Sequence, residues 1–441
     1  MKAISHCLFL AVLICFGGCP APLTGEPPPE DRAYFPSHLV QNEKQLFIFS
    51  YNQDLRYASG SILKLDLDNA NAVLSFSPIP SFAEAPVLLQ DSKILFLSRS
   101  SDEMYQFDIK KNKTEKIEFD KTADPKGKVR NWLWHDPYYL SMLSTEGDEI
   151  KGLIGYLNDR VSIEKIEDIQ NSRLEHYGEL EVFSLEKNSL KINHTYLLQD
   201  IVPTAPETST DKKEKLSYRR ISHIGGLRIL RKGAEQFVLI GADALLTSSN
   251  LFSATRQTRL LWFSTQNIET KIDQETVGAH QLPAERIVGF DIIEVTNQHQ
   301  IYAIMENPNL LVRVDLTRKG NSFEAKTKSQ VPLCEKPSDI KIAPNKKTLL
   351  VSCAKNDEIL AFNTSDLMLV ARDSDTAVPF GRGPVRILFD SAPGNQRAFV
   401  SYSLDGSIGI FEIDDNLVNK NRLKTIGRIF EQGPHNHSGG K

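Results

Sequence analysis

Two stretches near the C-terminus share one outline. "VSCAKNDEILAF", from Val351 to Phe362, returns as "VSYSLDGSIGIF", from Val400 to Phe411. In both, apolar and polar residues alternate on either side of a turn, which is Asn356-Asp357 in the first stretch and Asp405-Gly406 in the second. This pattern is typical of a β-hairpin. Because the hairpin recurs at a constant offset, the sequence predicts a repeated structural unit.

A second mark precedes each hairpin, "PSDI" at Pro337 and "PVRI" at Pro384. Related marks elsewhere give seven expected starts, at residues 36, 86, 131, 226, 289, 337 and 384. Repeats of roughly 40 to 50 residues with several short strands are typical of β-propellers, in which each blade buries its faces against its neighbours. We therefore expect an all-β fold over residues 34–432 with seven blades. The long interval after residue 131 is interpreted as an inserted hairpin and loop at about 173–220, and an eighth, degenerate blade stays open as the alternative.

The stretch "PSDIKIAPNKKTLLVSCAKNDEILAFNT" from Pro337, with its echo from Pro384, resembles the YVTN-repeat propellers. These form a lactonase-like, seven-bladed group common in bacterial envelopes. The resemblance is clearest over the last third of the chain, where Cys353 and Tyr402 stand at the position of the family's asparagine. The repeat motif is structural in that family, so the resemblance implies the fold and says little about function.

The N-terminus has the pattern of a bacterial lipoprotein signal over residues 1–18. Lys2 is followed by the apolar run "CLFLAVLICF", which is shorter than the ~20 residues that a membrane-spanning helix needs. "FGGC" resembles a lipobox and predicts cleavage before Cys19, which would carry acyl chains such as palmitate. Ordinary secretion and a retained anchor are the alternatives. Residues 19–33 are proline-rich and predict a tether, residues 433–441 predict a disordered tail, and Pro20 favours the outer membrane over the inner one.

Cys334 and Cys353 are the two remaining cysteines once the signal has been removed and Cys19 acylated. Two thiols outside the reducing cytoplasm favour one disulfide, which would stabilise the fold by about 3 kcal/mol on the chain-entropy model. The alternative is two separate buried cysteines. No metal site is expected, because a structural zinc needs four ligands and no CxxC or CxxH pair is present.

Candidate binding residues follow from the position of each mark at the start of an innermost strand. Propellers usually bind ligands at one mouth of the central channel, so the polar residue in third place of a mark is a candidate. These residues are His38, Arg228, Asp291, Asp339 and Arg386. Arg382 is a further candidate, because the glycines on both sides would let its backbone approach a ligand closely. The aromatic residues Trp132, Trp134, Tyr138 and Tyr139 would either stack on a sugar ring or pack between strands.

The composition excludes some functions and leaves two open. With 52 basic and 56 acidic residues, the chain has no electrostatic basis for nucleic-acid binding. No serine-hydrolase, zincin, nucleotide-binding, haem or calcium motif is present, so no cofactor is expected and the catalytic residues are unknown. The sequence favours a monomeric, lipid-anchored envelope protein that binds or scaffolds a protein or glycan partner. The alternative is an enzyme of the lactonase or quinone-dependent dehydrogenase type, with its site at the channel mouth.

Overall fold

The computed structural model describes most of the chain from Gly25 to Ile426. The described residues are 25–426 without 53–56, 70–71, 91, 100–102, 120–136, 147–148, 157–178, 199–216, 233–234, 248–254, 273–276, 296–297, 321, 375–381, 393–396 and 414–417. The predicted signal peptide, Cys19, Trp132, Trp134 and the predicted tail lie outside these ranges. Among the described residues, no helix is long and apolar enough to cross a membrane.

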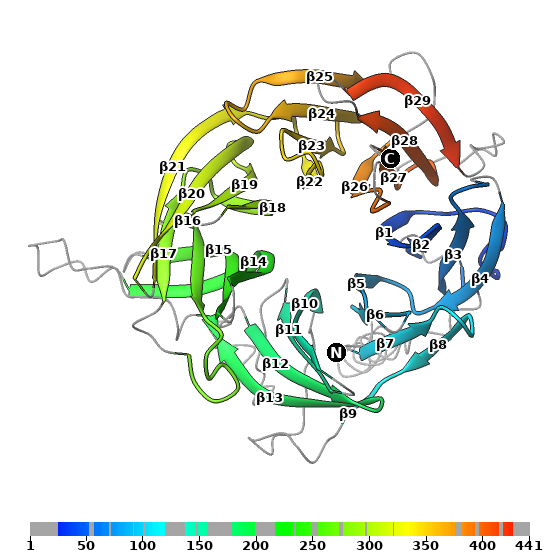
Figure 1. The fold of residues 1–441 in the computed structure, drawn as a ribbon, viewed down its shortest axis with the longest axis horizontal. Helices are drawn as coiled ribbons and strands as arrows, with labels where there is room; N and C mark the ends of the chain where they lie inside the picture. Colours follow the sequence, from blue (N-terminus) through cyan, green and yellow to red (C-terminus); the bar gives the residue numbers. More distant parts are fainter. Residues whose placement is uncertain are drawn as a thin grey trace, which may run out of the picture.

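Seven antiparallel sheets stand around a central axis, each with its first strand innermost (Figure 1). The first blade consists of β1 (Pro36–Asn42), β2 (Gln45–Ser50), β3 (Gly60–Asp66) and β4 (Val73–Ile79). The second consists of β5 (Ala83–Leu88), β6 (Lys93–Ser98), β7 (Glu103–Asp108) and β8 (Lys113–Lys116). The third consists of β10 (Pro137–Glu146), β11 (Glu149–Tyr156), β12 (Glu179–Glu186) and β13 (Ser189–Leu197), with β9 (Glu118–Phe119) added in parallel at its outer edge.

The remaining four blades follow the same order from the axis outwards. The fourth consists of β14 (Ser217–Lys232), β15 (Glu235–Thr247), β16 (Thr255–Ser264) and β17 (Gly278–Leu282). The fifth consists of β18 (Arg286–Val295), β19 (Gln298–Glu306), β20 (Leu310–Lys319) and β21 (Ser322–Pro332). The sixth consists of β22 (Pro337–Ile342), β23 (Thr348–Cys353), β24 (Glu358–Asn363) and β25 (Leu369–Ser374). The seventh consists of β26 (Pro384–Phe389), β27 (Arg397–Tyr402), β28 (Ser407–Ile413) and β29 (Val418–Ile426).

The predicted seven-bladed propeller is confirmed, and no sheet among the described residues forms an eighth blade. The starts at Pro36, Pro337 and Pro384 coincide with the first residues of β1, β22 and β26. The structure corrects the interpretation of residues 173–220 as an inserted hairpin and loop. Its two strands are β12 and β13, and β12 pairs with β11, so the hairpin supplies the outer half of the third blade.

The recurring turn residues tie each of the last two blades to the loop that enters it. In the sixth blade, the backbone N–H of Glu335 donates to Asn356 Oδ1 at 2.9 Å. In the seventh, the backbone N–H of Arg382 donates to Asp405 Oδ2 at 3.0 Å. A short polar side chain in the turn therefore satisfies an amide that the sheet leaves unpaired. This contact explains why the hairpin outline carries an Asn or Asp at the same place twice.

The ring closes by packing between the first and seventh blades. Phe399 and Ile408 are fully buried against Leu46 of the first blade, in a core that both blades share. Beside this core, the Gln41 amide donates to Asp390 Oδ1 at 2.7 Å. All four strands of the seventh blade come from one continuous part of the chain. Closure therefore depends on side chains between two complete blades.

Part of the predicted tether is packed on the ring, which corrects the expectation for residues 25–33. Glu26 forms a bridge with Tyr57, and the N–H of Ala58 donates to the Glu26 carbonyl at 2.9 Å. The Tyr34 ring packs against that of Tyr57 at a tilt of 55°, with 4.4 Å between ring centroids, and Ala33 is only 5% exposed. The segment before β1 thus belongs to the folded body from Gly25 onwards.

The predicted disulfide is confirmed. Cys334 and Cys353 are bonded, with 6.0 Å between their Cα atoms. The bond links the loop before β22 to the last residue of β23. It fixes the same entering loop that Asn356 holds by its side chain, and it excludes the alternative of two separate thiols.

Candidate binding site at the ring centre

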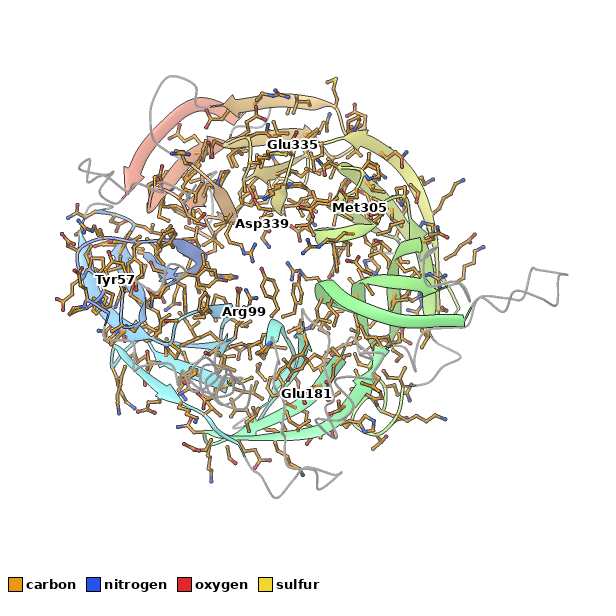
Figure 2. All side chains as sticks on the ribbon, turned by 180° about the vertical axis from the view of Figure 1, so that it is seen from behind. Tyr57, Arg99, Glu181, Met305, Glu335 and Asp339 are labelled. Atoms are coloured by element: carbon orange, nitrogen blue, oxygen red, sulfur yellow. A yellow bond between two sulfur atoms is a disulfide. The ribbon has the colours of Figure 1, made fainter. Side chains whose placement is uncertain are left out.

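A β-bulge recurs near the start of the innermost strands. The register shifts between Pro36 and His38, between Pro137 and Tyr139, and between Pro384 and Arg386. A bulge turns the strand locally and redirects the next side chain. Figure 2 shows the labelled Arg99 and Asp339 at the inner edge of the ring. We call the group His38, Glu84, Arg99, Tyr138, Tyr139 and Arg386 the central cluster.

Glu84, on β5, is shared between two partners of the central cluster. Its side chain is 1% exposed, and its Oε2 lies 3.2 Å from His38 Nε2. Its Oε1 lies 3.5 Å from Arg99 Nη1. Arg99 keeps 30% of its side chain exposed, so this arginine meets solvent at one side of the cluster.

Arg386, on β26, joins the seventh blade to the third. Its Nη2 donates to the Tyr138 hydroxyl at 3.1 Å, while its Nη1 donates to the Ser338 carbonyl at 3.3 Å. The Arg99 guanidinium carbon lies 5.3 Å from the centre of the Tyr138 ring, a cation–π distance. Tyr138 therefore lies between two arginines. The central cluster brings together side chains of the first, second, third and seventh blades.

The pKa values in the cluster are shifted by burial and by its cations. Burial lowers the pKa of His38 well below 6.5, and the nearby Arg386, Lys341 and Arg99 lower it further. These effects outweigh the Glu84 carboxylate, whose Oε2 lies 3.2 Å from Nε2, so we take the imidazole as neutral near pH 7. Burial raises the pKa of Tyr138, and Glu84 adds to this rise. Tyr138 therefore remains a neutral phenol.

Three cations act on His38. Arg99, Lys341 and Arg386 each lower the pKa of its imidazole, and the Glu84 carboxylate lies 3.2 Å from it. Burial opposes the charge of Arg386, but Tyr138, Asp339 and Glu84 outweigh it and raise the pKa of Arg386. Arg386 is therefore permanently charged. Planar guanidinium groups in partly dry surroundings recognise carboxylates and phosphates, which makes an anion the best-matched ligand class.

The structure separates the six candidates from the sequence into three groups. His38 and Arg386 meet in the central cluster, and Arg228 acts electrostatically on its Tyr139. Arg382 lies apart, with 67% of its side chain exposed and its Nε 4.0 Å from Asp357 Oδ2. The binding role of all six remains a prediction.

Asp291 and Asp339 connect neighbouring blades. The N–H of Ile342 donates to Asp291 Oδ2 at 2.8 Å, and the N–H of Ile387 donates to Asp339 Oδ2 at 2.8 Å. Each carboxylate thus crosses from its own innermost strand to that of the next blade. We assign to both a structural task that their position in the repeat alone did not reveal.

The sequence missed Glu84 and Arg99. The proline used as a start mark, Pro86, lies inside β5, where the register shifts between Glu84 and Val87. Proline is tolerated there because a bulge needs no ladder hydrogen bond from it. The signal that could have revealed the site is a glutamate in the apolar stretch "SFAEAPVLL". Among the described parts of the chain, no three His, Cys, Asp or Glu side chains are placed to hold a metal ion.

Replacing Asp339 by alanine is expected to lower the free energy of unfolding by about 1–3 kcal/mol, because the buried Ile387 amide loses its acceptor. Urea unfolding measures the change. Asp339→Asn keeps an acceptor oxygen and should retain most of the stability. Equal midpoints for Asp339→Ala and the unmodified protein would show that this bond between blades contributes nothing.

Stability is expected to fall with pH below about 6.5 because of His38. Its pKa is lowered in the folded state, so between the two pKa values only the unfolded chain binds the proton. The free energy of unfolding then decreases by up to about 1.4 kcal/mol per pH unit until the folded-state pKa is reached. Urea titrations from pH 7.5 to pH 4.5 test this. His38→Gln should have a shallower slope than the unmodified chain, and identical slopes would contradict the assignment.

Comparisons with known proteins support the fold. No protein-family model matches the sequence, and no curated protein is similar enough to match. Among solved structures, the β-propeller domain of Cps50 (Swd1) from Myceliophteria thermophila has a TM-score of 0.53 at 9% identity. The match covers 88% of this chain and 99% of the Cps50 domain.

The periplasmic gluconolactonase PpgL of Pseudomonas aeruginosa has a TM-score of 0.51 at 12% identity, and the match covers 90% of this chain and 95% of PpgL. Hydrazine synthase of Kuenenia stuttgartiensis has a TM-score of 0.51 at 11% identity, with 86% and 96% covered. At these identities the likeness shows the fold alone: this chain is a seven-bladed β-propeller, similar in architecture to a periplasmic gluconolactonase.

Proposed function

We propose that the protein is a binding module of the bacterial cell envelope, and that it holds an anionic group of its ligand at the ring centre. The observation that carries this proposal is the convergence of Arg99 and Arg386 on Tyr138, beside the buried Glu84 that pairs with His38 and Arg99. Carboxylates and phosphates suit such a site, because arginine offers them paired donors in a fixed geometry. Glu84 and Asp339 supply two carboxylates near these cations, and an anionic group of a ligand would complete the charge pairing.

The partner in this proposal is a protein or glycan with an acidic group, and the module acts as a monomer. The proposed location rests on the N-terminal pattern, in which an acylated Cys19 anchors the chain in a membrane, with the outer membrane favoured over the inner one. The intact mass of the protein isolated from membranes tests the anchor. A mass for cleavage before Cys19 with acyl chains attached supports it, and an unmodified mass would remove the anchor from the proposal.

A panel of small probes tests the binding role. We expect gluconate, glucuronate and inorganic phosphate to raise the thermal unfolding midpoint of the protein, and glucose to leave it unchanged, since ligands that bind only the folded state stabilise it. Competition between gluconate and phosphate would place both at one site. A panel in which glucose and gluconate have the same effect would contradict recognition by charge.

Hydrolysis of a lactone is the second candidate. The pair His38–Glu84 favours it, because a carboxylate that orients a neutral imidazole is a common arrangement of a general base. However, the remaining ring nitrogen, Nδ1, lies 3.3 Å from Ser37 Oγ, so a substrate would have to displace this contact. We therefore rank hydrolysis second. Hydrolysis of glucono-1,5-lactone that is lost in His38→Gln would promote it, and a rate equal to that of buffer would dismiss it.

A further inference from the structure

The packed N-terminal segment defines where an anchor would pull on the ring. A Cβ atom added to Gly25 would lie 2.5 Å from the backbone carbon of Tyr57, so the chain passes tightly against the loop between β2 and β3. At its other end the segment touches the seventh blade, where a Cβ on Gly406 would lie 2.8 Å from the Ala33 carbonyl oxygen. Residues 25–34 are thus held at two loops, the first between β2 and β3 and the second between β27 and β28.

These loops lie on the same face as the central cluster. We call it the start face, because it is where the innermost strand of each blade begins. Tyr51, in the first of the two loops, has its ring centroid 6.2 Å from that of His38. The N–H of Tyr51 donates to the carbonyl of Phe35, the residue just before β1, at 3.0 Å. The segment and the cluster are therefore neighbours through one loop.

Little chain remains between this packed segment and the predicted lipid. Only residues 20–24 separate Cys19 from Gly25. Fully extended, they span about 20 Å at ~3.3–3.6 Å per residue. The opposite face lies further away by the length of β1, about 20 Å again for its seven residues. A lipid at Cys19 would consequently hold the start face next to the bilayer and keep the opposite face away from it.

We infer that the start face is turned towards the membrane that anchors the protein, where acidic lipid headgroups compete with the acidic group of the partner for the central cluster. This inference rests on the proposed function, both for the acylated Cys19 and for anion binding. Headgroup phosphates match the guanidinium groups of Arg99 and Arg386 in charge and geometry. In this orientation the bilayer presents its phosphates directly to the face on which the cluster lies.

Fluorescence quenching on vesicles tests the orientation. The lipidated full-length protein is reconstituted with phosphatidylcholine carrying a nitroxide headgroup, and one label is placed by Leu404→Cys on the start face or by Lys44→Cys on the opposite face. Leu404 is 51% exposed and the Lys44 side chain 75%, so both sites accept a label. We expect the label at 404 to lose most of its fluorescence and the label at 44 to keep it. Equal quenching of the two labels would overturn the orientation.

Two variants test the orientation of the start face and the binding of headgroups separately. A flexible Gly-Ser linker inserted between residues 24 and 25 leaves the fold untouched and should reduce the difference between the labels, because the tether no longer limits the distance. Adding phosphatidylglycerol to the vesicles should increase quenching at 404 in the unmodified protein and not in Arg386→Gln. An equal increase in Arg386→Gln would overturn the headgroup assignment. Protein that does not float with the vesicles would instead show that the anchor is absent, which contradicts the proposed function itself.

Discussion

A Glu84→Ala variant is expected to lose about 3–5 kcal/mol of its free energy of unfolding, because removing one member of a buried charge pair leaves its partner uncompensated. Glu84 is 1% exposed and lies 3.2 Å from His38 and 3.5 Å from Arg99. Without it, the cations around His38 would face one another across the ring centre. Urea unfolding at pH 7 measures the loss.

The matched control for this prediction is Glu115→Ala on the outer strand β8. Glu115 also pairs with a cation, Lys113, at 2.9 Å, but both side chains are exposed. Exposed ion pairs contribute little, so its midpoint should not move measurably. The same two variants also report on binding, because Glu84→Ala should bind anions more tightly while being less stable. Equal midpoints in both variants would contradict the description of Glu84 as the buried counter-charge.

An Arg386→Gln variant is expected to bind gluconate at least about 30-fold more weakly, since truncating one partner of a buried, hydrogen-bonded charge pair costs about 2–5 kcal/mol of binding energy. Arg386 has a raised pKa, donates to Tyr138 at 3.1 Å and acts on His38, so it is the central cation of the cluster. Isothermal titration measures the change.

Arg382→Gln is the control for the binding prediction. This arginine has the same charge and belongs to the same blade, but its side chain is 67% exposed and it lies apart from the cluster. Its loss should change the affinity for gluconate by less than a factor of about two, since exposed charges contribute weakly. If both arginine variants weakened binding equally, the anion would be held by the general field of the protein and the central cluster would not be its site.

The fold was predictable from the sequence because the last two blades repeat the same residue types at strand starts and turns. Pro337 and Pro384 begin strands, where a missing N–H costs no ladder hydrogen bond. Asn356 and Asp405 accept an amide from the entering loop. Both the strand start and the turn depend on residues close together in the sequence, so they produce a recognisable residue pattern. The start of the second blade was misplaced because Pro86 satisfies the same requirement at a bulge, inside β5.

Only some residues of the site could be predicted from the sequence, because the contacts of the site join side chains of different blades. His38 and Arg386 follow a bulge and could be selected by position, whereas Glu84 and Arg99 have no mark of their own. The roles of Asp291 and Asp339 depend on which amide of the next blade lies opposite, and the angle between blades decides that. The segment from Gly25 to Ala33 has the composition of a free linker, yet Glu26 pairs with Tyr57 and Ala33 is buried against the turn at Gly406, contacts that its own sequence does not reveal.

The most direct test of the central claim is an isothermal titration of the full-length protein with gluconate and, under the same conditions, with glucose. Gluconate is an open-chain anion and glucose is an uncharged ring, so the Arg386→Gln variant is needed to assign a difference between them to charge. The structure predicts saturable binding of gluconate that weakens with added salt, is lost in Arg386→Gln and is absent for glucose. Binding of both probes with the same affinity, unaffected by Arg386→Gln, would contradict an anion site at the centre of the ring.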